Sequence, residues 1–305
     1  MTDDCHRQNR IGLNEEAKYM KKNLVYLAAI LMCTCVFLMY VFVVKTQADT
    51  RAPEISFPEE IPAISVLDPE TDFLQDVTAY DKADGDVTDS LVVASVRLVD
   101  TDGTVQVTYA AFDKAGNVAQ AVRQGVYTDY ESPRFSLSTS LTFSGSTYFD
   151  IFDLVHAEDQ LDGNISHRIR ITSMDEAAIN AVGMHEVELQ TSNSLGETVN
   201  LVVPVEVYAP GTYDASLTLK DYLIYLPVNG KLDAKSYLEA YTRAGMQTIL
   251  SGSMPAGFTL DMKNNVRMDV PGVYTVEYRV TQTVGAGAGA TAYTGYAKLI
   301  VVVEG

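Results

Sequence analysis

The sequence contains no tryptophan, and only three of its 305 residues are cysteines. Cys5, Cys33 and Cys35 all lie near the N-terminus, so no disulfide can form within the rest of the chain. Small secreted animal domains usually depend on disulfides. An exported protein without them is more typical of a bacterial surface, and the cysteine content predicts that setting.

Positive charge is also scarce, with 22 basic against 40 acidic residues and a formal net charge of −18. Six of the basic residues but only four of the acidic ones lie at or before Lys45, so the remainder of the chain carries a net charge of −20. A surface with this charge repels nucleic acids and anionic lipids and keeps an exposed domain soluble. The sequence therefore predicts no nucleic-acid partner.

Charged residues are missing altogether from Asn23–Val44, a mostly apolar stretch of 22 residues between Lys22 and Lys45. At about 1.5 Å per residue, a helix of this length crosses a hydrocarbon core of about 30 Å. We predict a cytoplasmic tail over 1–22, a transmembrane helix over 23–44 and a linker over 45–52. The alternative is a signal peptide cleaved near Ala48, although its apolar region would normally span only about 7–15 residues.

Basic residues are concentrated before this apolar stretch. Five precede it and two follow it closely: Arg7, Arg10, Lys18, Lys21 and Lys22, then Lys45 and Arg51. The positive-inside rule places the N-terminus in the cytoplasm and everything after Lys45 outside. The predicted location is the cell membrane, with a single span and extracellular C-terminal domains.

The remainder of the chain repeats itself after about 80 residues, a spacing typical of tandem modules. Asp-Lys-Ala-Asp-Gly-Asp-Val-Thr over 81–88 corresponds to Asp-Gln-Leu-Asp-Gly-Asn-Ile-Ser over 159–166. Each motif is followed by an alternating stretch, after Gly103 and Gly183, and a third such stretch follows Gly272. Period-two alternation indicates strands with one buried face. The expected inward residues are Val105, Val107, Tyr109, Ala111, His185, Val187, Leu189, Thr191, Tyr274, Val276, Tyr278 and Val280.

These patterns predict an all-β fold of tandem immunoglobulin-like β-sandwiches preceded by one transmembrane helix. The expected domains cover 53–130, 133–209 and 213–305, and the third is divergent. In that third domain, Leu232–Ala244 places Leu232, Tyr237, Leu238 and Tyr241 on one helical face after a capping Asp233. We predict a short helix there.

The motifs Asp-Lys-Ala-Asp-Gly-Asp-Val-Thr, Gly-Thr-Val-Gln-Val-Thr-Tyr and Asp-Lys-Ala-Gly-Asn resemble those of bacterial surface immunoglobulin-like repeats of the hyalin-repeat-like type. The resemblance is closest over 52–128, less close over 134–208 and least over 213–305. It implies β-sandwiches that serve as spacers or adhesion modules on cell-envelope proteins. It carries over no catalytic residues.

Four acidic residues crowd the first Asp-Gly turn, namely Asp81, Asp84, Asp86 and Asp89. Carboxylate oxygens suit Ca²⁺, which makes these residues candidate metal ligands. Their spacing does not match an EF-hand loop, and a tight turn favours Asp and Gly without any metal. We predict a turn that binds no metal, with calcium as the alternative.

Motifs for catalysis are missing from the sequence. It has no Gly-x-Ser-x-Gly elbow, no His-x-x-x-His pair and no cysteine after Cys35. We predict a protein that is not an enzyme and has no catalytic or cofactor-binding residues. The leading function is a structural scaffold or an adhesion and interaction module. The alternative is an accessory of cell-wall or exopolysaccharide machinery that binds an envelope protein or a glycan, with Tyr293 and Tyr296 as the expected free aromatic residues.

Overall fold

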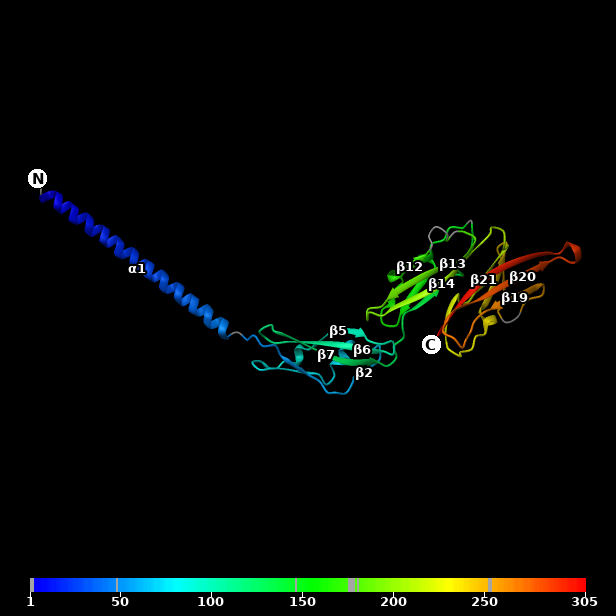
Figure 1. The fold of residues 1–305 in the computed structure, drawn as a ribbon, viewed down its shortest axis with the longest axis horizontal. Helices are drawn as coiled ribbons and strands as arrows, with labels where there is room; N and C mark the ends of the chain where they lie inside the picture. The colour runs from blue at the N-terminus through cyan, green and yellow to red at the C-terminus, as the bar shows by residue number, and fades with distance from the viewer. Residues whose placement is uncertain (1–2, 48, 146, 175–178, 180, 252–253) are drawn as a thin grey trace. The chain divides into compact units, whose positions relative to one another are not determined.

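The computed structural model describes residues 3–47, 49–145, 147–174, 179, 181–251 and 254–305. It begins with one long helix, α1 (Asp3–Gln47), drawn in blue in Figure 1. Within α1, Lys18–Val43 contains an 18-residue window with a mean hydropathy of 2.5, none of it buried. By length and composition, this helix can cross a membrane. In the described residues after it, the regular secondary structure consists of strands and short 3₁₀ helices.

The chain divides into two compact units. The first combines Met1–Pro58, Asp76–Val92 and Ala110–Ala121, and the second combines Glu59–Gln75, Val93–Tyr109 and Val122–Gly305. The predicted domain limits, which are drawn differently, stay a prediction.

The first group of strands forms two sheets, one with the order β1-β3-β4 and one with the order β2-β7-β6-β5. Their bounds are β1 Glu54–Ser56, β2 Ala63–Ile64, β3 Thr78–Asp81, β4 Gly85–Asp86, β5 Val92–Leu98, β6 Thr104–Phe112 and β7 Val118–Tyr127. Two short 3₁₀ helices connect them, η1 (Glu70–Leu74) and η2 (Thr88–Ser90). We call this group the first module.

The second module repeats this strand order, with sheets β11-β10-β8 and β12-β13-β14-β9. Its strands are β8 Arg134–Leu137, β9 Thr142–Ser144, β10 Val155–Asp159, β11 Gly163–Asn164, β12 Arg170–Met174, β13 Gly183–Ser192 and β14 Thr198–Tyr208. The 3₁₀ helices η3 (Ile151–Asp153) and η4 (Ser166–Arg168) lie between them. In both modules a short strand pairs in parallel with the last strand, β2 with β7 and β9 with β14.

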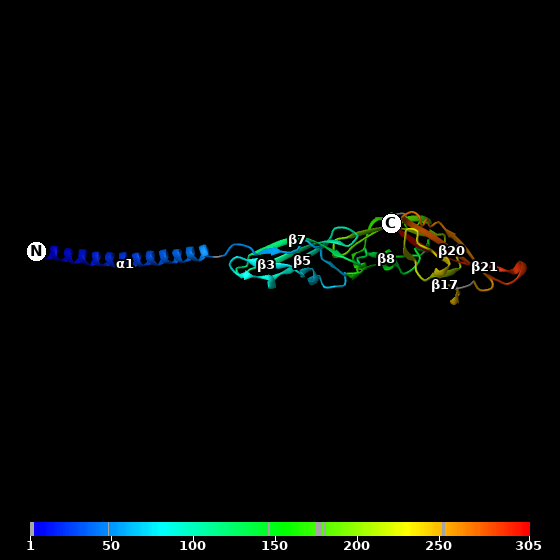
Figure 2. The same cartoon turned by 90° about the horizontal axis from the view of Figure 1, so that it is seen from below.

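The third module forms one seven-stranded sheet with the order β18-β17-β15-β21-β20-β19, and β16 pairs with β21 beside that path. The bounds are β15 Ala215–Leu219, β16 Leu223–Pro227, β17 Leu238–Arg243, β18 Met246–Ile249, β19 Phe258–Asn264, β20 Gly272–Val284 and β21 Thr291–Glu304. Its 3₁₀ helices are η5 (Ala234–Tyr237) and η6 (Gly287–Gly289). The β20–β21 hairpin, orange to red in Figures 1 and 2, is its longest element.

The predicted strand alternation is confirmed in β6, β13 and β20. The inward side chains are at most 1% exposed at Val105, Val107, Tyr109, Ala111, Val187, Leu189, Thr191, Val276, Tyr278 and Val280. At the strand starts, His185 and Tyr274 are only half-buried. The hairpin turn after β6 closes through a bond from Asp113 N to Asn117 O, and Gly116 supplies the required positive φ of 88°.

The helix predicted over Leu232–Ala244 is wrong. Ala234–Tyr237 forms one short 3₁₀ turn, Asp233 provides no side-chain cap, and Leu238–Arg243 continues as strand β17. β17 pairs with β15 and β18, and these pairings override the helical spacing of the apolar residues.

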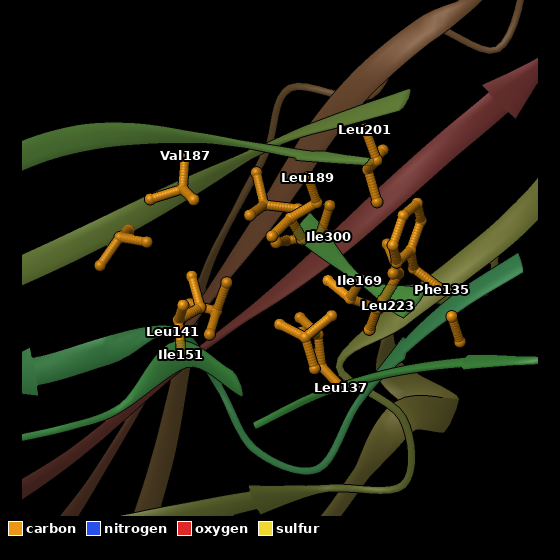
Figure 3. Close-up of a cluster of buried hydrophobic side chains, with 14 of the residues drawn as sticks. Phe135, Leu137, Leu141, Ile151, Ile169, Val187, Leu189, Leu201, Leu223 and Ile300 are labelled. Carbon is orange, nitrogen blue, oxygen red and sulfur yellow. The ribbon is translucent and has the colours of Figure 1, made fainter. Parts of the chain in front are cut away.

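The second and third modules share buried apolar surface within the second compact unit. Leu223 and Ile300 from the third module belong to the same core cluster as Phe135, Leu137 and Leu189 of the second (Figure 3). Neighbouring Val301 instead packs into the core of the third module. Successive residues of β21 point to opposite faces, so this strand contributes to two cores at once.

Polar groups complete this contact between the second and third modules. Lys298 on β21 is 3% exposed, and its Nζ lies 2.6 Å from a carboxylate oxygen of Glu206 on β14. Tyr296 donates its hydroxyl to the same carboxylate at 2.8 Å. Ser140 bonds through Oγ with both the backbone N and the backbone O of Lys298. A buried ammonium is therefore paired with a carboxylate, as a stable interior requires.

Candidate functional site

Asp81 lies in an acidic cluster within the first compact unit. It ends β3, and its Oδ1 accepts hydrogen bonds from the backbone N of Ala83 at 2.7 Å and of Asp84 at 2.9 Å. These bonds fold the β3–β4 turn, in which Gly85 adopts a positive φ of 81°. The residue is 1% exposed, and its buried Oδ2 has no hydrogen-bond partner in the described part of the chain.

Asp113, which opens the turn between β6 and β7, is 8% exposed. Asn117 donates its backbone N to Oδ1 and its side-chain Nδ2 to Oδ2, both at 2.7 Å. Burial opposes ionisation of Asp113, but the hydrogen bonds from Asn117, Gly116 and Ala115 outweigh it and hold the pKa of its carboxyl below the ordinary value. The side chain is therefore fixed in place as a carboxylate.

Asp49, two residues beyond the end of α1, completes the cluster. Its backbone O accepts from Asn117 Nδ2 at 3.1 Å, and its Oδ1 accepts from Arg51 N at 3.1 Å. Its Oδ2 is buried and has no hydrogen-bond partner among the described residues. Asp49, Asp81 and Asp113 each contribute one oxygen to a group whose members lie within 4.8 Å of one another.

The cluster concentrates negative charge without compensation. Two unit charges about 4.8 Å apart repel by about 3 kcal/mol at an effective dielectric constant of about 20. No salt bridge between described residues reaches Asp49, Asp81 or Asp113. The nearby Lys114 is paired with Asp84 instead, at 3.4 Å. Three convergent carboxylates are a donor set suited to a hard cation.

Only one of the four sequence-predicted metal candidates belongs to this cluster. Asp84 accepts from the backbone N of Lys114 at 2.8 Å. Asp86 accepts from Thr88, whose hydrogen bonds lower the pKa of the Asp86 carboxyl. Asp89 is exposed in η2. The structure thus brings Asp81 together with two other residues and gives Asp84 and Asp86 turn-stabilising bonds.

Sequence reasoning missed Asp49 and Asp113 as possible ligands. They lie 32 residues before and after Asp81, on the segment that follows α1 and on a different hairpin. For Asp113 a signal was available in the repeat, because this residue corresponds to Asn193 in the second module. A change from amide to carboxylate beside a buried aspartate alters the charge of the site.

The second module shows a corresponding arrangement, in which an amide and a hydroxyl stand where the first module has the carboxylates of Asp113 and Asp49. Asp159, which corresponds to Asp81, bonds through Oδ1 to the backbone N of Leu161 and Asp162 at 3.0 and 2.8 Å. Its Oδ2 accepts from Asn193 Nδ2 at 3.0 Å. The same amide donates to the hydroxyl of Tyr130 at 2.7 Å, and that hydroxyl donates to Glu197. Burial and the adjacent Glu197 carboxylate raise the pKa of Tyr130, which therefore stays neutral.

The two tyrosines expected to be free for sugar stacking are both engaged. Tyr296 is 7% exposed and stacks on Tyr213 at 4.9 Å between ring centroids, so the expectation of a free ring is wrong for this residue. The guanidinium of Arg243 lies 3.4 Å from the ring centroid of Tyr293, which is half-buried. Tyr296 is therefore buried, and Arg243 covers one face of the Tyr293 ring.

No family model matches the sequence, and a search of curated proteins finds no relative. Among solved structures, one match is a carbohydrate-binding module (CBM51-2) with INT domains from Clostridium perfringens ZmpB, at 18% identity and a TM-score of 0.21 over 54% of this chain and 31% of that chain. Another is the protocadherin gamma B2 extracellular region, at 9% identity and a TM-score of 0.19 over 84% of this chain and 60% of that chain. The chain thus spans less than two thirds of either protein's length. These low TM-scores assign no function.

Proposed function

We propose that the chain is a single-pass membrane protein whose β-sandwich modules act outside the cytoplasm as a scaffold or as an adhesion and interaction module. The observation that carries the proposal is the order of its parts. The apolar span within α1, whose 18-residue window is not buried, is followed in the described residues by strand modules with a strong excess of acidic residues. The five basic residues before the span favour a cytoplasmic N-terminus.

The proposal includes a bacterial envelope as the setting and no enzymatic activity. It is supported by the lack of cysteines after Cys35 and by the resemblance of the Asp-Gly turn motifs to bacterial surface repeats. On this account the modules provide a stable surface, and binding partners are other envelope proteins.

Cross-linking in intact cells tests this function. A photoreactive amino acid is placed at Leu67 or Tyr148, which are 74% and 87% exposed, in the full chain. We expect discrete cross-linked products with envelope proteins, and none from the buried control position Val107. Products that are the same from exposed and buried positions, or contain only cytoplasmic proteins, would contradict the proposal.

A second candidate, glycan or partner binding to envelope machinery, is favoured by an open groove in the third module. Its volume is about 1060 Å³, and its lining combines charged Asp233 and Asp261 with apolar Phe258 and Met262. Full-length protein in nanodiscs, titrated with cell-wall glycan fragments, tests this alternative. Binding that is lost in Asp261→Ala but retained in Arg267→Ala, an exposed residue outside the groove lining, would favour it over the scaffold.

A further inference from the structure

In the first and second modules, different groups surround the corresponding buried carboxylates of Asp81 and Asp159. In the second module, the amide of Asn193 supplies a hydrogen bond to the buried Oδ2 of Asp159. In the first module, the corresponding residue is Asp113, which has no donor to offer, and Oδ2 of Asp81 has no partner among the described residues. The group from the preceding segment also differs, because the second module has the neutral hydroxyl of Tyr130 where the first has the Asp49 carboxylate.

We propose that Asp49, Asp81 and Asp113 bind a hard divalent cation, Ca²⁺ by preference, which replaces the hydrogen bonds made by Asn193 in the second module. Besides the three convergent carboxylates, the proposal rests on Asp81, a residue that is 1% exposed. Its carboxylate faces the other two, and its buried Oδ2 has no hydrogen-bond partner among the described residues. Buried charges persist in proteins when they are paired or coordinate a metal.

The ligand atoms favour a hard cation over a softer metal ion. All the ligand atoms are carboxylate oxygens, and Ca²⁺ accepts six to eight oxygens, so water would complete its shell. Hydrogen bonds to Asp81 Oδ1 and to Asp113 hold both side chains in place before the ion arrives. The residue set also differs from the Asp84, Asp86 and Asp89 carboxylates that the sequence suggested.

The position of Asp49 gives the ion a consequence beyond stability. Asp49 lies directly after the membrane helix, whereas Asp81 and Asp113 belong to the turns of the first module. A cation held by all three ties the juxtamembrane segment to that module. Its removal would loosen the segment around Arg51, although the bond from Asn117 Nδ2 to Asp49 O and the buried Pro53 would remain.

Calorimetric titration of the full chain with CaCl₂, in detergent after removal of metal with a chelator, tests the site. We expect one saturable binding event with a Kd of about 0.1–1 mM, the range of extracellular calcium modules. Asp113→Asn should weaken Ca²⁺ binding at least about tenfold, as loss of a ligand weakens it no less than loss of a supporting group. In the absence of calcium, the same variant should melt at or above the wild-type Tm, because its amide can donate to Asp81 as Asn193 does to Asp159.

Two further variants make the result decisive. Asp49 lies outside the strands, so Asp49→Asn should weaken Ca²⁺ binding without unfolding the module. Asp86 lies beside the turn that contains Asp81 but outside the cluster, so Asp86→Asn should bind Ca²⁺ as the wild type does. Calcium should also protect the bond after Arg51 from trypsin in the wild type but not in Asp49→Asn. A wild-type chain without a saturable site, or an Asp113→Asn variant that binds calcium normally, would overturn the proposal.

Discussion

The buried, inward-facing side chains of β6, β13 and β20 contribute to the stability of their modules. Val276 on β20 is fully buried among Tyr278, Leu299 and Val301 in the core of the third module. Val276→Ala removes two methyl-sized groups and should cost roughly 1–3 kcal/mol. Hydrogen exchange of the full chain should show faster exchange in β19–β21, with β1 and β3 unchanged. Equal loss of protection in β1 and β3 would mean that the modules do not unfold independently.

Asp162 makes the second module sensitive to acid. Burial opposes its ionisation, but the bond from Ser194 N at 2.7 Å and the ion pair with Arg168 at 2.5 Å outweigh burial and lower the pKa of Asp162. A carboxyl with a lowered folded pKa stabilises the fold above its unfolded pKa of about 3.9, and this contribution is lost as the pH falls through the folded value.

Melting curves of Asp162→Asn between pH 7 and pH 2 check this contribution. The variant should have a lower Tm than the wild type at pH 7, and the difference should shrink as the pH falls below about 4. Asp153→Asn, an exposed residue of the same module, is the control and should follow the wild type. A difference in Tm between Asp162→Asn and the wild type that is constant across the range would show that the carboxylate charge is not the cause.

Strands could be predicted from the sequence where only one of their two faces is buried. Period-two alternation identified β6, β13 and β20 together with their inward residues, because each strand has one core face and one solvent face. β21 is different, since Lys298 and Ile300 are buried on the face opposite Val301. Only contact between modules explains that burial, and a local pattern cannot reveal it. For the same reason Tyr296, expected to be free, is buried.

The candidate metal site was predictable only in part. Asp81 was recognised because it lies in a dense run of acidic residues, but its neighbours in the run are bonded to the turn. The carboxylates that meet it come from Asp49 and Asp113, brought together by strand pairing and by the path of the linker. A cluster formed by distant loops has no spacing signature in the sequence.

The contact between β14 and β21 across the modules includes the ion pair between Glu206 and Lys298. Lys298→Met would leave Glu206 with Tyr296 as its donor. It should cost roughly 1–3 kcal/mol, less than a fully buried pair, because the Glu206 side chain is 22% exposed. Chemical denaturation of the single variants and of Lys298→Met/Glu206→Gln, analysed as a double-mutant cycle, measures the coupling. Strictly additive effects would contradict a direct interaction.

At the scale of the whole molecule, the chain's charge and hydropathy predict a membrane topology. The apolar window in Lys18–Val43 follows a basic N-terminal segment and precedes the acidic remainder of the chain. With Cys5, Cys33 and Cys35 replaced by serine or alanine, a single cysteine is introduced at Arg10 or at Tyr148, which is 87% exposed. The native residue Ser140 would be a poor choice because it is 7% exposed and bonded to Lys298.

A membrane-impermeant maleimide applied to intact cells should label the cysteine at 148 and leave the one at 10 unlabelled until the cells are lysed. The reason for this expectation is the positive-inside rule, which predicts that Arg7, Arg10, Lys18, Lys21 and Lys22 keep the N-terminus in the cytoplasm. Replacing the basic residues before the span by glutamine should weaken this preference and expose the cysteine at 10 in part of the molecules. Protection of position 148 in intact cells would reverse the topology, and a mature chain starting near Asp49 would show that the helix is cleaved rather than retained as an anchor.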